Sequence, residues 1–82
     1  MISRMGMERF TMARSEINRM FGIRLYNLIT GQYRSCAEFA RVIGVIPQAV
    51  TNWCNGRNFP SMEHLYTIRD VLGCSWSDLF DN

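Results

Sequence analysis

The chain has 82 residues, of which 48% are hydrophobic and 20% are charged, a composition typical of one compact domain rather than of a disordered segment or a repeat array. No stretch approaches the roughly 18 uninterrupted apolar residues that a membrane-spanning helix needs, and the N-terminus does not resemble a signal peptide, so we predict a cytoplasmic protein without membrane contact. The three cysteines form no CxxC pair, which favours free thiols over a disulfide framework.

The formal net charge of +2 is unevenly distributed along the chain. Residues 1–41 carry seven Arg against three Glu, a net charge of +4, whereas residues 42–82 carry a net charge of −2. All nine basic residues are Arg, and guanidinium is well suited to bind phosphate and guanine edges. This pattern is compatible with a nucleic-acid partner but does not by itself identify one.

The first predicted helix lies near the start of the chain. Residues 1–14 show no helical period, and we interpret them as an N-terminal arm or extension before a domain that spans residues 15–82. From Ser15, a candidate N-cap, apolar residues recur at spacings of three and four. Gly31 is expected to end this helix, and Gly22 is an unfavourable residue inside it.

Two short helices are predicted next, separated by a glycine-containing turn. Ser35 and Glu38 form a capping-box pattern that predicts a helix start, and Gly44 stands where a left-handed residue would end that helix. Pro47 suits the first position of the following helix, because its missing N–H costs nothing there. That helix is expected to end at Asn55-Gly56.

The C-terminal part predicts two further helices. Ser61 caps the first of them, and Gly73 ends it. Its inward residues are predicted to be Met62, Leu65, Ile68 and Leu72. Ser75 and Asp78 repeat the capping pattern before a short last helix, in which Leu79 and Phe80 are expected to close the core. No segment alternates with period two, so we predict an all-α fold, a compact domain of five helices.

The two short helices have the outline of a helix-turn-helix, whose second helix enters the DNA major groove. At about 100° per residue, Val50 and Trp53 share one face of that second helix. The opposite face carries the amides Gln48, Asn52 and Asn55. Gln or Asn pairs in bidentate fashion with N6 and N7 of adenine, so this face is a candidate for base recognition, although a polar face that contacts nothing remains an alternative.

From Ser35 to Phe80 the sequence resembles the phage-repressor and Cro-like (XRE-like) helix-turn-helix family. The resemblance lies in the ordered spacing of Phe39-Ala40, Ile43-Gly44-Val45, Val50, Trp53, Gly56, Pro60-Ser61, Leu72-Gly73 and Leu79. It implies the lambda-repressor-like DNA-binding fold and a role in transcription regulation.

The resemblance also implies roles for individual residues. The positions that touch base edges in the family match Pro47, Gln48, Ala49, Thr51 and Asn52. Asn55 matches a position that holds a phosphate, and Arg57 and Asn58 lie in a loop that lines the DNA backbone. The charge pattern, independently of the family, adds Arg34 and Arg41 as candidate phosphate contacts.

Several residues depart from the family pattern. Ile46 stands where a Ser or Thr cap is usual, Cys36 replaces a frequent phosphate-binding Gln, and Cys54 replaces a frequent acidic residue. Arg69 replaces a residue that is usually small. These departures put single contacts in doubt, but not the fold.

Other functions find less support in the sequence. The single histidine, His64, is interpreted as a surface or capping residue, and no catalytic motif is present, so we expect no enzymatic activity. A zinc site would require the fold to gather Cys36, Cys54, His64 and Cys74; buried thiols are the preferred interpretation. Trp53, Trp76, Phe39 and Phe80 could stack on single-stranded bases, but their spacing favours the core.

The sequence therefore predicts a sequence-specific double-stranded DNA-binding regulator, a repressor of phage or prophage type without a cofactor or small-molecule ligand. A homodimer on a palindromic operator is expected, because one short helix reads only a few base pairs. Two alternatives remain: an antitoxin-type regulator with a protein partner, and a protein-interaction module that has lost DNA binding. The apolar side chains of the arm, Met5, Met7, Phe10 and Met12, favour the last of these.

Overall fold

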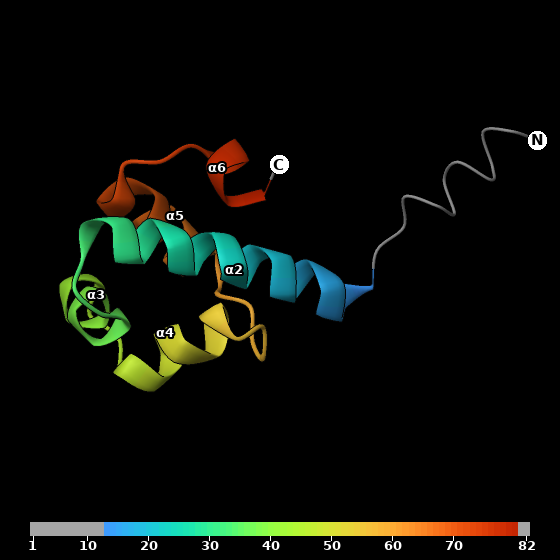
Figure 1. Ribbon diagram of the computed structural model, residues 1–82, viewed down its shortest axis with the longest axis horizontal. Helices are drawn as coiled ribbons and strands as arrows, with labels where there is room; N and C mark the ends of the chain where they lie inside the picture. The colour runs from blue at the N-terminus through green and yellow to red at the C-terminus, as the bar shows by residue number, and fades with distance from the viewer. Residues whose placement is uncertain (1–12, 81–82) are drawn as a thin grey trace, which may run out of the picture.

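The computed structural model describes residues 13–80, and this part of the chain is entirely helical apart from its turns. The helices are α2 (Arg14–Gln32), α3 (Cys36–Ile43), α4 (Pro47–Cys54), α5 (Met62–Leu72) and α6 (Trp76–Phe80). The long helix α2 runs through the middle of the molecule, with α3 and α4 on one side and α6 on the other (Figure 1). This arrangement confirms the predicted all-α, five-helix domain.

A single core joins all five helices. Phe21, Leu25 and Ile29 of α2 point into it at spacings of four, as an amphipathic helix requires. The other buried apolar residues are Phe39 and Ala40 of α3, Val50 and Trp53 of α4, Leu65, Ile68 and Leu72 of α5, and Leu79 of α6. No helix within residues 13–80 is long and apolar enough to cross a membrane.

The start of α2 differs from the sequence prediction. The helix begins at Arg14, with Ala13 as its N-cap, so Ser15 lies inside the first turn and does not cap it. Ala13 has no side-chain acceptor, and the carboxylate of Glu16 instead accepts a hydrogen bond from the Ala13 N–H at 3.1 Å. Arg14 therefore belongs to the helix rather than to the predicted arm, whose residues 1–12 lie outside the described part of the chain.

The end of α2 also differs, because Gly31 does not stop the helix. The helix continues to Gln32, and Gly31 does not adopt the left-handed conformation of a C-cap glycine. The Gln32 side chain donates a hydrogen bond to the Leu72 carbonyl at 2.9 Å, and the Tyr33 ring packs on Phe39 with centroids 5.3 Å apart. Tertiary contacts thus hold the last turn of α2 in place beyond the glycine.

Gly22 has a packing role that explains its place in the middle of α2. A Cβ at this position would lie 2.6 Å from the carbonyl oxygen of Trp53 and would also collide with that of Cys54. Only a residue without a side chain lets the backbone of α2 approach the end of α4 so closely. Gly22 is unfavourable for helix formation, but the packing of α4 against α2 requires it.

The predicted helix caps are confirmed at the later helices. Ser35 and Ser61 accept hydrogen bonds from the backbone N–H of Glu38 and His64. Gly44 and Gly73 are left-handed, with φ of 81° and 66°. Ser75 and Asp78 form the complete reciprocal box, with bonds of 3.2 and 3.0 Å. At α3, however, the Glu38 carboxylate accepts from the Arg34 N–H rather than from that of the cap residue.

Two residues that were predicted to face inward are exposed to different degrees. Met62 is 64% exposed because it is the first residue of α5 and lies beyond the packed part of that helix. Phe80 is 41% exposed in the last turn of α6, although one side of its ring packs on Phe21 at 5.4 Å. The remaining predicted core residues of these helices, Leu65, Ile68, Leu72 and Leu79, are buried.

Candidate nucleic-acid interface

The turn between α3 and α4 sets the geometry of the site. The N–H groups of Gly44 and Val45 both donate to the Ala40 carbonyl, at 2.9 and 3.0 Å, which satisfies the end of α3 in the manner of a left-handed C-cap. Val45 packs against the core. Ile46 then adopts an extended conformation, and Pro47 begins α4 without a side-chain cap. The two short helices are thus joined by three residues.

Helix α4 has one buried and one open face, as its sequence predicts. Val50 is fully buried and Trp53 is 5% exposed, whereas Gln48 is exposed and Asn52 is half-buried. Thr51 lies between these faces and is also half-buried. The amide face is therefore not covered by the interior of the molecule.

The two amides of this face are hydrogen-bonded to each other. Nε2 of Gln48 donates to Oδ1 of Asn52 at 2.9 Å, across one helical turn. Within residues 13–80, Oε1 of Gln48 and Nδ2 of Asn52 have no hydrogen-bond partner. Oε1 of Gln48 can therefore accept, and Nδ2 of Asn52 can donate, a hydrogen bond to an external group. Recognition of an adenine edge requires one acceptor and one donor.

The other predicted base-contacting residues lie in different surroundings. Pro47 is exposed at the start of α4. Ala49 is half-buried, packs against the core and lines a groove of about 1020 Å³ between the start of α2, the end of α4 and the 57–61 segment. Pro47 and Gln48 are therefore the exposed members of the predicted set, whereas Ala49, Thr51 and Asn52 are half-buried.

The five predicted phosphate contacts are all exposed. Arg34 precedes α3, and Arg41 lies in its last turn. Asn55 is the C-cap of α4, and the backbone N–H groups of Arg57 and Asn58 donate to the Asn52 carbonyl at 2.9 and 3.4 Å. The loop after α4 is thus tied to the same helix that carries the amide face.

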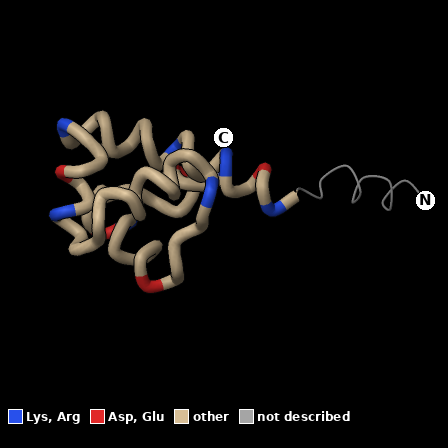
Figure 2. Tube along the Cα trace, turned by 90° about the horizontal axis from the view of Figure 1, so that it is seen from below, with Lys and Arg blue, Asp and Glu red and all other residues tan. Residues whose placement is uncertain are grey.

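The charges are spread over the molecule rather than gathered on one face. Basic residues lie at both ends of the described domain (Figure 2). Within residues 13–80, Arg34, Arg41 and Arg57 form no ion pair with a carboxylate. Their guanidinium groups are consequently available to an external anion.

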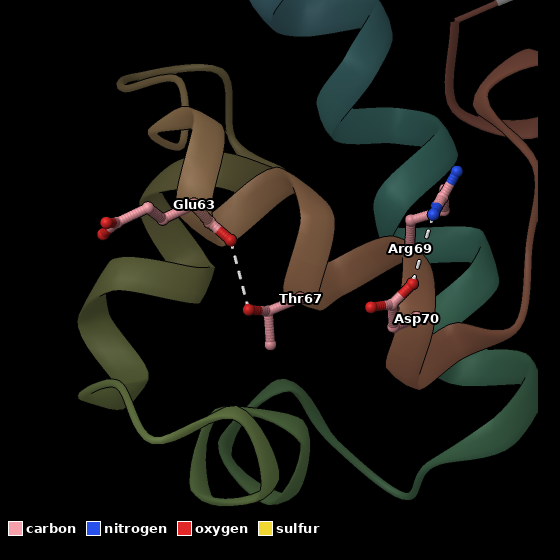
Figure 3. A network of polar contacts seen from close by, with 4 residues as sticks. All are labelled: Glu63, Thr67, Arg69 and Asp70. Atoms are coloured by element: carbon pink, nitrogen blue, oxygen red, sulfur yellow. Dashed lines mark hydrogen bonds and ion pairs between the residues drawn. The ribbon is translucent and has the colours of Figure 1, made fainter.

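Arg69 belongs to a different environment, on α5. Its guanidinium lies 4.8 Å from the centre of the Trp76 ring and 3.4 Å from the Asp70 carboxylate (Figure 3). On the same helix, the Thr67 hydroxyl donates to the Glu63 carbonyl at 3.1 Å (Figure 3). Arg69 therefore attaches α5 to α6 through its contact with the Trp76 ring.

His64 and the cysteines take mainly structural positions. The His64 ring packs on Trp53 at 5.3 Å, and its Nδ1 lies 3.0 Å from the Ser61 hydroxyl. Of the residues considered for a zinc site, Cys36 and Cys54 come together, with their sulfur atoms 3.9 Å apart. Nowhere in residues 13–80 do three His, Cys, Asp or Glu side chains gather as a metal site would require. No sequence signal predicts this pairing of thiols, since only the packing of α3 on α4 creates it.

The two short helices, the left-handed glycine between them and the open face of α4 define a helix-turn-helix protein. A family profile described as helix-turn-helix matches residues 32–79. This match covers more than half of the chain, and the chain belongs to this family, the XRE/Cro-C1 type of helix-turn-helix. The protein is accordingly a DNA-binding transcription regulator.

The fold is also similar to that of a solved structure. The solution structure of the SOS-response transcriptional repressor LexA from Eubacterium rectale superimposes with a TM-score of 0.76 and 28% sequence identity. The similarity covers 87% of this chain and 76% of that one. No curated protein matches the chain.

Proposed function

We propose that this regulator is a sequence-specific repressor of the phage type, which occupies a palindromic operator without carrying out chemistry. The observation that carries the proposal is the open amide pair of Gln48 and Asn52 on the second helix of the helix-turn-helix. Base contacts from this pair and Thr51 would supply specificity. Phosphate contacts from Arg34, Arg41, Asn55, Arg57 and Asn58 would fix the position of the domain on the duplex.

An exposed apolar cluster supports the homodimer in this proposal. Phe59 and Phe80 are 38% and 41% exposed and flank the buried Phe21, with ring centroids 4.8 and 5.4 Å from it. Ile17, 41% exposed, lies on α2 one helical turn before Phe21. Exposed apolar clusters are a common feature of protein–protein contacts, and an operator with two half-sites needs two copies of the domain.

Selection of bound duplexes from a random pool tests the operator and the symmetry together. We expect an inverted repeat whose half-sites are separated by about 34 Å, one helical turn of DNA. Light scattering with the selected duplex should then show two protein chains per duplex. A pool from which nothing is enriched at low salt would contradict the proposal, and a second protein that co-purifies in place of a second copy would favour the antitoxin-type alternative.

Replacement of Gln48 tests its role in base recognition. In Gln48→Ala we expect a loss of roughly 1–3 kcal/mol of discrimination at one base position, with little change at the others. The measurement is a set of binding titrations on single-base variants of the selected duplex. Asn27→Ala, which removes an exposed amide from α2, is the matched control and should change nothing. Equal weakening on every sequence would instead assign Gln48 to the DNA backbone.

A further inference from the structure

Two thiols meet where the start of α3 lies beside the end of α4. Cys36 is the first residue of α3, and Cys54 is the last residue of α4. Their sulfur atoms are 3.9 Å apart, and both side chains are half-buried. The third thiol, Cys74, lies in the connection between α5 and α6. The described residues thus hold one preformed pair of thiols, and this pair spans the helix-turn-helix.

We propose that Cys36 and Cys54 are an oxidation site: a low-molecular-weight disulfide such as oxidised glutathione converts them into an intramolecular disulfide, which lowers the affinity of the domain for DNA. The part of this inference that concerns DNA rests on the proposed function. The formation of the disulfide does not depend on the proposed function, and it is measured independently of DNA.

The chemistry proceeds by two thiol–disulfide exchanges. The Cys36 thiolate attacks one sulfur of oxidised glutathione, so that a mixed disulfide forms and one glutathione thiolate leaves. The Cys54 sulfur then attacks the Cys36 sulfur, and the second glutathione thiolate leaves. Two protein thiols are oxidised, one small disulfide is reduced to two thiols, and the two protons pass to the departing thiolates.

The order of the two steps follows from the surroundings of Cys54. Burial, with a further contribution from the adjacent Cys36, raises the pKa of the Cys54 thiol to about 12. Cys54 therefore stays protonated while Cys36 makes the first attack, because the thiolate is the nucleophile. Once Cys36 is held in the mixed disulfide it carries no charge, so its contribution to the pKa of Cys54 disappears, while burial, the larger cause, still keeps that pKa raised.

The disulfide would alter the site because its sulfur atoms must approach each other to about 2.05 Å. The end of α4 has little freedom to move, since the carbonyl groups of Trp53 and Cys54 rest against the backbone of α2 at Gly22. Any backbone movement that closes the gap between the sulfur atoms therefore falls on the first turn of α3, which Arg34 precedes. Such a movement would displace Arg34, a proposed phosphate contact, relative to the amide face of α4.

The bond is tested by treatment of the whole protein with oxidised glutathione. We expect the number of free thiols to fall from three to one, with a cross-linked peptide that joins Cys36 to Cys54 and a chain that stays monomeric on a non-reducing gel. Cys74→Ser should form the same cross-link. In Cys54→Ser, the reaction should stop at a glutathione adduct on Cys36. Three thiols left unmodified, or a cross-link that involves Cys74, would overturn the inference.

The effect on DNA is measured with the selected duplex before and after oxidation. We expect about a tenfold weaker affinity in the oxidised protein, within the range typical of coupled sites, and full recovery after reduction. Cys36→Ser, which lacks the attacking thiol, should bind equally well with and without oxidant. A disulfide that leaves the affinity unchanged would overturn the regulatory part of the inference. A reduced protein that binds no duplex would instead contradict the proposed function, and the thiol count would still decide whether the bond forms.

Discussion

The hydrogen bond between Gln48 and Asn52 restricts two side chains that we propose as base contacts. The two amides lie four positions apart on α4, a spacing at which helical side chains meet. Their bond at 2.9 Å limits the rotation of both side chains, so part of the entropy of ordering them is lost before DNA arrives. Helical geometry places both amides on the outward face from the sequence alone, whereas the hydrogen bond between them was found only in the structure.

The stability of the domain also depends on the absence of a side chain at Gly22. In Gly22→Ala the new methyl group would meet backbone carbonyl oxygens, which cannot rotate away as a flexible side chain would. We expect Gly22→Ala to destabilise the domain by about 1–3 kcal/mol, the usual cost of overpacking. The measurement is the urea concentration at the midpoint of unfolding.

Gly31→Ala provides the matched control in the same helix. Nothing lies within 4 Å of the position that its Cβ would occupy, and its backbone is helical. This substitution should stabilise the protein by about 0.5–1 kcal/mol, because Ala is the better helix former. If the two variants behaved alike, the close approach of α2 and α4 would not explain the glycine.

At the scale of elements, the turn between α3 and α4 depends on the left-handed conformation of Gly44. No atom lies within 4 Å of a Cβ built there, so Gly44→Ala would suffer only from its backbone angle of φ 81°. We expect a loss of stability of about 1–2 kcal/mol, the cost of the left-handed conformation for an L-residue. Thermal unfolding measures it.

Gly44→Asn separates conformation from packing at this turn. Asn tolerates the left-handed region better than Ala does, although its side chain is larger. It should therefore lose less stability than Gly44→Ala. A greater loss in the Asn variant would mean that space, rather than backbone conformation, makes glycine necessary here.

The elements that the sequence predicted well are those with local signals. The caps at Ser35, Ser61 and Ser75 and the glycine stops at Gly44 and Gly73 each depend on residues within a few positions, and all lie where predicted. The predicted start of α2 was wrong because the Glu16 carboxylate, rather than a serine side chain, accepts from the first N–H group. The predicted end of α2 was wrong because the helix end depends on a distant partner, the Leu72 carbonyl that Gln32 contacts. The contact between Cys36 and Cys54 was missed for the same reason. The role of the candidate site residues in DNA binding stays a prediction.

For the molecule as a whole, the small net charge of +2 limits nonspecific attraction to DNA. Electrostatic affinity would then depend on a few arginines near α3 and α4 rather than on a broad basic surface. Arg41→Ala should lower the slope of log affinity against log salt by about one unit, as expected for the loss of one phosphate contact. The measurement is a salt series of binding titrations on the selected duplex.

Arg69→Ala removes the same charge from a place remote from the proposed contact. Arg69 already contacts Trp76 and Asp70, so its loss should leave the salt slope unchanged. The contact between α5 and α6 should become weaker. An unchanged slope in Arg41→Ala would remove Arg41 from the phosphate contacts. A lower slope in both variants would point to the total charge instead of to particular contacts.

The close backbone contact at Gly22 means that α4 is held in place by residues other than those on its exposed face. The helix is anchored by Val50, Trp53 and its own terminal carbonyl groups, and none of these belongs to the outward face. Positions 48, 51 and 52 can consequently be exchanged as a set while the anchoring stays intact. If these three side chains read the operator as proposed, replacing them would change the target of an otherwise unchanged scaffold.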